Sequence, residues 1–171
     1  MATGYLGIIA LAERLHRRAM DIVEAELVRL GVGDLNATQA MILLQIGAEQ
    51  MSVGELTLRG CYQGSNVHYS LSKLVEGGYV LQERSARDRR VVKVSATDKG
   101  RRLAADLEHL YAAVEADVID LGMDPALMER CEAGLTRLER LTGICLAQGA
   151  RRNQPAASAN VIPIRTDMQV A

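Results

Sequence analysis

The hydrophobic pattern of this chain changes its period at Gly77-Gly78. Upstream of this pair, apolar residues recur every three or four positions, which is the spacing of amphipathic helices. Downstream, two β-branched stretches at 79–84 and 90–94 flank a polar segment, an arrangement typical of a β-hairpin. Helical spacing then returns and continues to about residue 147. The pattern predicts a mainly α-helical fold with one small β-hairpin, in the α+β class.

The composition agrees with a helical core. Hydrophobic residues make up 49% of the 171 positions, yet Trp and Phe are absent and only 5 residues are Tyr. Aliphatic residues and Met must therefore fill the core, and this set favours helices over a large sheet. The chain has no apolar run of about 18 residues, so we expect no membrane partner. Its N-terminus lacks the basic start and apolar block of a secretory signal, which predicts a cytoplasmic protein.

Capping residues mark where helices begin. Asn36 with Gln39, and Ser52 with Glu55, have the spacing of capping boxes, in which each side chain accepts from the other residue's backbone N–H. Further caps are expected at Ser65, Thr97 and Asp124. The helices predicted from these starts and from the apolar spacing cover 5–30, 37–49, 53–60, 66–76, 98–121 and 125–147.

Three short helices and a hairpin in the middle of the chain give the element order of a winged helix-turn-helix. The helix over 66–76 would be the one that enters the major groove of DNA. Its apolar stripe, formed by Val67, Leu71, Leu74 and Val75, would dock on the core. Its other side carries groups that can hydrogen-bond to base edges or phosphates. These candidate DNA-binding residues are Ser65, Asn66, His68, Tyr69, Ser72 and Lys73.

The predicted hairpin is the most basic part of the sequence. Within 84–93, five Lys and Arg residues face a single acid, Asp88. Guanidinium groups near a hairpin tip can enter a minor groove or bind phosphate. Asp88 would repel DNA, so we expect it to pair with Arg90 and shape the loop. Taken alone, the helix is also explained as an ordinary surface helix, and the hairpin as a solvated loop. The further candidates for DNA binding are Arg84, Arg87 and Arg89.

Residues 88–100, DRRVVKVSATDKG, resemble the wing of the MarR family of transcriptional regulators. The family pattern is D-R-R, an alternating strand, and L-T-x-x-G where the next helix opens. Residues 65–80 are similar to the family's recognition helix, in register and without gaps up to Arg90. The motifs agree over 52–100, and the overall similarity covers about 5–147.

The resemblance implies that Arg89 is the minor-groove residue and that Asp88 with Arg90 shapes the wing. Two features differ from the commonest family pattern. Ala96 stands where the family usually has Leu, and the turn at 60–64 resembles that of an LdtR-like branch of the family.

A homodimer on a pseudo-palindromic operator is also implied, in which the first helix interlocks with the last two. The long apolar helices favour a dimer independently, because a small winged domain cannot cover them. The candidate interface residues are Ile8, Leu11, Leu135, Leu138 and Leu141. The predicted division is an N-terminal dimerisation helix over 1–34, a DNA-binding domain over 35–96, C-terminal dimerisation helices over 97–147 and a flexible tail over 148–171.

The resemblance further implies a ligand-responsive repressor whose small-molecule effector binds between the dimer helices and the winged domain. His16 and Arg18 are candidate polar anchors of this pocket. Core packing explains the apolar candidates equally well. The apolar lining would be formed by Leu15, Ala19, Met41, Leu44 and Tyr111.

A thiol-based redox regulator is the alternative mechanism. Cys61 precedes the predicted recognition helix, and a helix N-terminus can lower the pKa of a thiol. A buried cysteine acting as a small hydrophobic residue competes with that interpretation. An enzyme is not expected, because the chain has no nucleophile motif with a neighbouring base and no glycine-rich phosphate loop. No cofactor and no metal site are predicted.

Overall fold

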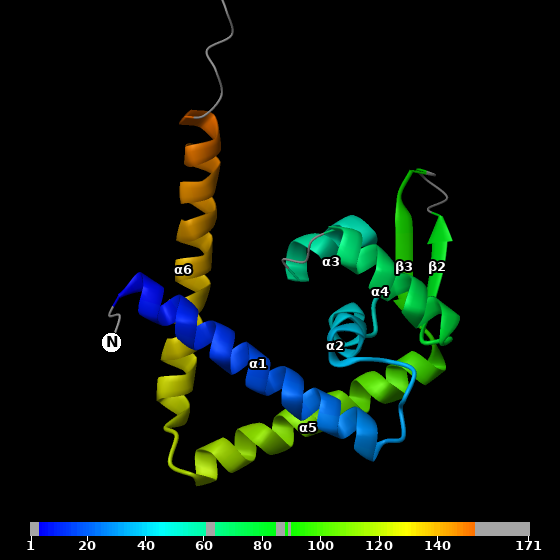
Figure 1. Ribbon diagram of the computed structural model, residues 1–171, viewed down its shortest axis with the longest axis horizontal. Coiled ribbons are helices and arrows are strands. Elements are labelled where there is room, and N and C mark those ends of the chain that lie inside the picture. Colours follow the sequence, from blue (N-terminus) through cyan, green and yellow to red (C-terminus); the bar gives the residue numbers. More distant parts are fainter. Residues whose placement is uncertain (1–3, 61–63, 85–87, 89, 153–171) are drawn as a thin grey trace, which may run out of the picture. The chain divides into compact units, whose positions relative to one another are not determined.

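The computed structural model describes residues 4–60, 64–84, 88 and 90–152, which divide between two compact units, Met1–Asp117 and Val118–Ala171 (Figure 1). The second unit contains the end of α5 and all of α6 (Pro125–Arg152). The predicted order of helices and hairpin is confirmed. The first unit contains α1 (Tyr5–Arg29), α2 (Ala37–Ile46), β1 (Met51–Ser52), α3 (Val53–Gly60), α4 (Gly64–Glu76), β2 (Val80–Arg84), β3 (Val92–Ala96) and most of α5 (Asp98–Asp120).

Both predicted capping boxes are present. The Asn36 Oδ1 accepts from the Gln39 N–H at 3.0 Å, and the Gln39 Oε1 accepts from the Asn36 N–H at 3.0 Å. The Ser52 Oγ accepts from the Glu55 N–H at 3.1 Å, and the Glu55 Oε2 accepts from the Ser52 N–H at 2.7 Å. These bonds satisfy N–H groups that the first helical turn leaves unpaired, so α2 and α3 begin where the sequence places them.

Three predicted helix boundaries are wrong. The last helix, expected to end at residue 147, continues to Arg152, into the segment predicted to be a flexible tail. The helix expected to reach residue 49 ends at Ile46, because Gly47 has a φ of 57°, a left-handed conformation that favours glycine. The helix expected to start at residue 66 starts at Gly64, so Ser65 lies inside α4 rather than before it.

The sheet has three antiparallel strands in the order β1-β3-β2. Val80 lies opposite Ala96 and Arg84 opposite Val92, so β2 and β3 form the predicted hairpin. Strand β1 was not predicted, because two residues are too few to show an alternating pattern. Its Met51 lies opposite Val94 and is 6% exposed. This pairing makes β3 the central strand and connects the hairpin to the start of α3.

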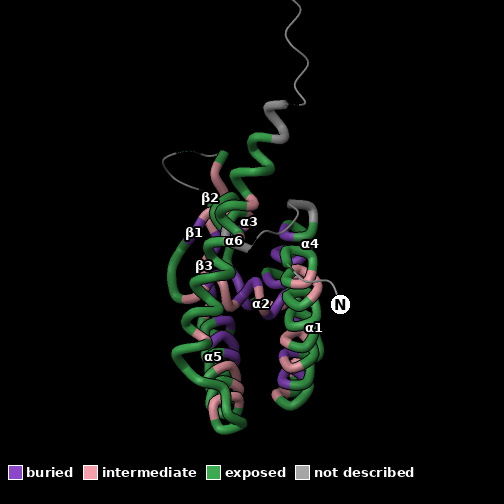
Figure 2. Tube along the Cα trace, turned by 90° about the vertical axis from the view of Figure 1, so that its left-hand side faces the viewer, coloured by how far each residue is buried: buried purple, intermediate pink, exposed green. Residues whose placement is uncertain are grey.

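The hydrophobic core of the first unit is centred on α2, which is largely buried (Figure 2). Helix α1 contributes Val23 and Leu27, whereas its N-terminal half has no buried residue in the described range 4–22. Val75, expected in the apolar stripe of α4, is 37% exposed. The large side chains that are fully buried are Val23, Leu27, Ile42, Leu43, Ile46, Leu56, Val67, Leu71, Leu74, Val80, Val94 and Leu107.

Tyr79, which follows α4, lies at a junction of three segments. Its N–H donates to the Leu74 carbonyl at 2.8 Å and closes the end of α4. Its hydroxyl donates to Asp34 Oδ1 at 2.8 Å, in the loop between α1 and α2. The Lys99 ammonium, in the first turn of α5, lies 3.8 Å from the centre of the Tyr79 ring. Burial, together with the hydrogen bond to Asp34, raises the pKa of Tyr79.

Two residues of the motif at the start of α5 complete this junction. The Thr97 N–H donates to the Tyr79 carbonyl at 2.9 Å, and the Thr97 hydroxyl donates to the Gly78 carbonyl at 2.7 Å. The Thr97 Oγ1 also accepts from the Gly100 N–H at 3.1 Å, so Thr97 is the predicted cap of α5. A Cβ at Gly100 would lie 2.1 Å from the Tyr79 carbonyl oxygen. Glycine is therefore required where α5 crosses the end of the α4–β2 turn.

The described side chains of the second unit, residues 118–148, form no buried core. Asp124 caps α6 as predicted, since its Oδ1 accepts from the Ala126 N–H at 2.9 Å. Among the described side chains of α6, residues 125–148, none is buried. Leu135 and Leu141 are 46% and 45% exposed. An apolar stripe of this length needs a partner surface to exclude water.

The close approach at Gly100 gives the first prediction. Gly100→Ala should lower the thermal midpoint of unfolding, because the new methyl group meets backbone atoms, and overpacking of this kind costs about 1–3 kcal/mol. Gly54→Ala is the matched control. A Cβ at Gly54 meets only the Ser52 Oγ, at 3.9 Å, so this variant should be as stable as the wild type or up to ~1 kcal/mol more stable. Equal midpoints for Gly100→Ala and the wild type in thermal denaturation would contradict this account of the junction.

Candidate nucleic-acid interface

Helix α4 divides into a buried face and an exposed face. Val67, Leu71 and Leu74 are fully buried against the core, as predicted. Of the predicted DNA-binding residues, Asn66, His68, Tyr69 and Ser72 are exposed, and Lys73 is half-exposed. The side chain of Ser65 lies outside the described part of the chain. The exposed face thus offers amide, imidazole, phenol and hydroxyl groups, which can donate to or accept from base edges.

Lys73 forms an ion pair on the same helix. Its Nζ lies 2.7 Å from the Glu76 Oε2, one turn further along α4. The hydrogen bond to Glu76 raises the pKa of Lys73. Glu76 was not among the predicted site residues, although the spacing of three positions is one at which helical side chains meet.

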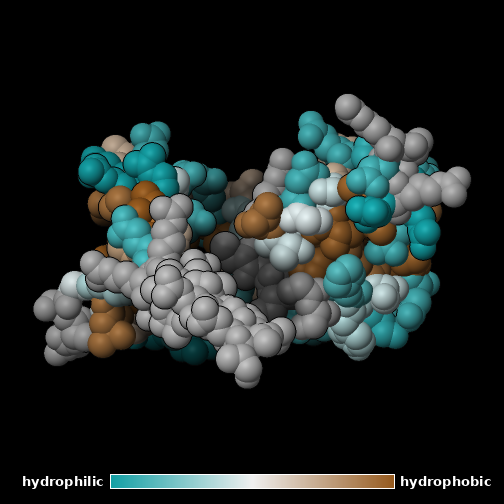
Figure 3. All heavy atoms as spheres, turned by 90° about the horizontal axis from the view of Figure 1, so that it is seen from above, coloured by the Kyte–Doolittle hydropathy of each residue, from teal (hydrophilic) through white to brown (hydrophobic). Residues whose placement is uncertain are grey.

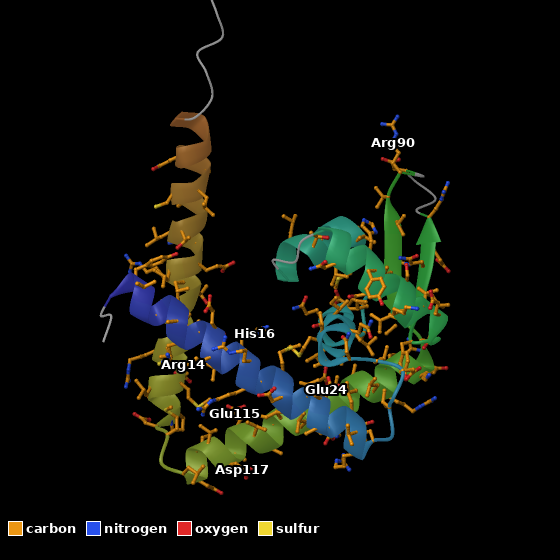
Figure 4. All side chains as sticks on the ribbon, viewed as in Figure 1. Arg14, His16, Glu24, Arg90, Glu115 and Asp117 are labelled. Atoms are coloured by element: carbon orange, nitrogen blue, oxygen red, sulfur yellow. The ribbon has the colours of Figure 1, made fainter. Side chains whose placement is uncertain are left out.

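The hairpin lies beside α4 in the first unit (Figure 1). Arg84 is exposed at the end of β2, and Arg90 is exposed at the tip of the hairpin, where its side chain points away from the body of the unit (Figure 4). Two predicted DNA-binding residues, Arg87 and Arg89, lie outside the described residues. The described part of the wing therefore presents cationic groups to solvent.

Asp88 contacts Arg90, but through the backbone. The Asp88 Oδ1 accepts from the Arg90 N–H at 2.9 Å, and the Asp88 carbonyl accepts from the Val91 N–H at 2.9 Å. A carboxylate that accepts from the backbone two residues on forms an Asx turn, which fixes the local chain direction. The sequence predicted that Asp88 pairs with Arg90. The donor in this contact is the Arg90 peptide N–H, which a charge pattern does not reveal.

The candidate effector residues fall into three groups. Met41, Leu44 and Tyr111 are half-buried against the core, and the Tyr111 hydroxyl lies 3.1 Å from the Met41 sulfur. His16 and Arg18 instead line a shallow pocket of about 570 Å³ on α1. The remaining two candidates, Leu15 and Ala19, are exposed and half-buried respectively. The full lining of the pocket is Arg14, His16, Arg17, Arg18, Met20, Asp21 and Thr38.

The candidate dimer residues are accessible. Ile8 and Leu11 are 41% and 58% exposed on α1, and on α6 Leu138 is half-buried while Leu135 and Leu141 are exposed. Hydrophobic surface, coloured brown, is visible among the hydrophilic residues in Figure 3.

Other kinds of site have little support in the described part of the chain. None of its helices is long and apolar enough to cross a membrane. It contains no group of three His, Cys, Asp or Glu residues able to hold a metal ion. Cys61, the candidate redox residue, lies outside the described residues.

Comparisons with known proteins agree with this geometry. The family model described as a winged helix DNA-binding domain matches residues 35–100. The exopolysaccharide II synthesis transcriptional activator ExpG of Rhizobium meliloti (strain 1021) is 38% identical over 139 residues, which cover 81% of this chain and 72% of that protein. Streptococcus pneumoniae FabT, solved in complex with DNA, has a TM-score of 0.66 at 24% identity, covering 83% of this chain and 99% of that one. A MarR transcriptional regulator from Methanosarcina mazei Go1 has a TM-score of 0.69 at 20% identity, with coverages of 82% and 99%.

The winged helix DNA-binding domain and the rhizobial relative together identify the chain as a DNA-binding transcriptional regulator. Within this class, the chain belongs to the MarR family.

The Asx turn at Asp88 allows loop geometry to be separated from charge. Asp88→Ala removes the acceptor for the Arg90 N–H and should weaken binding to duplex DNA, because the hairpin tip must then be ordered on binding. Asp88→Asn keeps an Oδ1 acceptor and removes the charge, so its affinity should equal or exceed that of the wild type. Fluorescence anisotropy titrations at physiological salt measure both affinities. If Asp88→Ala binds as tightly as Asp88→Asn, the turn does not shape the wing for DNA.

Proposed function

We propose that the protein binds a pseudo-palindromic DNA operator as a homodimer. In this complex α4 of each protomer lies in a major groove, and the hairpin of β2 and β3 contacts the neighbouring minor groove or backbone. The observation that carries the proposal is the division of α4 into a face buried on the core and a polar face exposed beside a cationic hairpin. Groups on the polar face can contact base edges, and the arginines can contact phosphate.

The dimer is supported by apolar residues that the single chain leaves exposed. On α1, Leu11 and Leu15 are 58% and 62% exposed, and on α6 the stripe around Leu135 and Leu141 has no cover among the described residues of its own unit. Burying apolar surface stabilises an interface by roughly 25 cal/mol for each Å² removed from water. A second copy of the same chain is the commonest partner for such a surface, and twofold symmetry would present two copies of α4 to DNA.

The effect on transcription predicted from the sequence is repression. The rhizobial relative is named as an activator. One DNA-binding dimer can produce either output, depending on where its operator lies relative to a promoter. Operator occupancy is therefore the activity we assign to the chain, and the position of each operator determines its consequence.

A small anionic molecule is the proposed effector. The pocket on α1 is lined by three arginines, His16 and one acid, Asp21, so its local charge favours an anion. Two of the predicted effector residues, His16 and Arg18, belong to this lining. A ligand held here would contact α1 and, through Thr38, the first turn of α2, on which the core of the first unit is centred.

Operator binding and dimerisation are tested together, using duplexes recovered from genomic fragments that the protein retains. With roughly 6–10 phosphates contacted, affinity should fall about 10³- to 10⁵-fold between 50 and 200 mM salt.

Leu135→Asp combined with Leu138→Asp should give a monomer in analytical sedimentation and abolish operator binding, because two charges would be buried at the interface. Leu58→Asp, at a residue that is 81% exposed on α3 and outside the helices proposed for the dimer, is the matched control and should stay dimeric. A salt-insensitive affinity contradicts the phosphate contacts, and a tight dimer in the double variant contradicts the interface.

The effector site is tested by thermal shift with a panel of small carboxylates. A ligand at a hundredfold excess over its Kd should stabilise the wild type by about 2.7 kcal/mol, which is measurable as a higher unfolding midpoint. Arg18→Gln should lose this shift. Arg102→Gln, at an exposed residue of α5 outside the pocket, should retain it. A shift that survives in Arg18→Gln would place the ligand elsewhere.

A further inference from the structure

We propose that Glu76 is a specificity-determining residue, which limits the sequence-independent attraction of α4 for DNA by holding the Lys73 ammonium in an ion pair. The proposal rests on the proposed function, in which α4 lies in the major groove. The residues predicted for the site are expected to promote DNA binding, whereas Glu76 would oppose it.

The ion pair removes the net charge of the recognition helix. Lys73 is the only Lys or Arg in the sequence of α4, and Glu76 is its only Asp or Glu. Their Nζ and Oε2 atoms are 2.7 Å apart, and the side chains are 41% and 62% exposed, so the pair lies at the surface that faces solvent. The other described groups on the exposed face are Asn66, His68, Tyr69 and Ser72, which are uncharged when His68 is neutral.

The helix dipole gives no reason for a carboxylate at Glu76. The C-terminal end of a helix carries a partial negative charge, which disfavours a carboxylate in the last turn and favours a cation there. Glu76 is the last residue of α4, and Gly77 and Gly78 already terminate the helix through backbone hydrogen bonds. Replacing the Glu76 carboxylate by a neutral amide therefore should leave α4 intact, which makes the substitution a clean test of its role toward DNA.

The pair affects operator and non-specific DNA differently. On non-specific DNA the affinity comes almost entirely from phosphate contacts, and the protein is free to adopt any register. On such DNA, a Lys73 side chain that is no longer paired with Glu76 could always contact a phosphate. On the operator, base contacts fix the position of α4, so Lys73 is held in a single geometry. Removing its partner Glu76 therefore adds less phosphate affinity there. Glu76 therefore lowers affinity for non-specific DNA more than affinity for the operator, and so raises the ratio between them.

The experiment is a double-mutant cycle on the full chain with Glu76→Gln, Lys73→Met and the double variant, titrated against the operator and a scrambled duplex of equal length. Glu76→Gln should raise affinity for the scrambled duplex by about 1.5- to 5-fold per protomer and lower the operator-to-scrambled ratio. The salt slope on the scrambled duplex should become steeper by up to ~1 per protomer, the value of one added phosphate contact. In the Lys73→Met background, Glu76→Gln should have little further effect, because the cation that it releases is absent.

Each other outcome is decisive. If Glu76→Gln changes affinity equally with and without Lys73, Glu76 acts on DNA directly and the ion pair has no part in specificity. If the operator gains as much as the scrambled duplex, Glu76 sets affinity alone, and this proposal is wrong while operator binding stands. If the wild-type protein binds neither duplex in a salt-dependent manner, the proposed function fails and this inference fails with it.

Discussion

The contact of Tyr79 with Asp34, Thr97 and Lys99 is the interaction on which the DNA-binding part of this protein depends. It joins the loop after α1, the end of α4 and the start of α5 at one residue, so the recognition helix, the wing and a long terminal helix share a fixed point. Gly100 is required there because the Tyr79 carbonyl leaves no room for a side chain. A change in the direction of α5 would therefore be transmitted to β2 and α4 without any intervening loop to absorb it.

Much of this architecture is encoded locally and could be predicted. Capping boxes at Asn36 and Ser52 place two helix starts, and the change of period after Gly77 places the hairpin, because each signal involves residues within a few positions of one another. Strand β1 could not be predicted, since its position is set by pairing with Val94, far along the chain. The hydrogen bond between Tyr79 and Asp34 spans 45 positions and has no local signature.

The candidate site shows the same limit. The polar and apolar faces of α4 follow from helical spacing, and the exposure of Asn66, His68, Tyr69 and Ser72 agrees with that spacing. Charge counting located Asp88 as the odd acid of the wing and paired it with Arg90, but it could not show that the donor is the Arg90 backbone N–H. A count of charges does not show which groups are in contact. It therefore also missed Glu76, whose proposed role depends on the cation that it holds.

The exposed apolar halves of α1 and α6 lie at opposite ends of the sequence, which matters for how the protein is made. Leu11 and Leu15 are translated long before Leu135 and Leu141. At about 5–20 residues per second, the interval is roughly 6–25 s. In the proposed dimer, α1 would have to stay soluble during that time without the surface that covers it. Arg14, Arg17 and Arg18, which alternate with its apolar residues, would give the nascent helix a charged face that keeps it soluble.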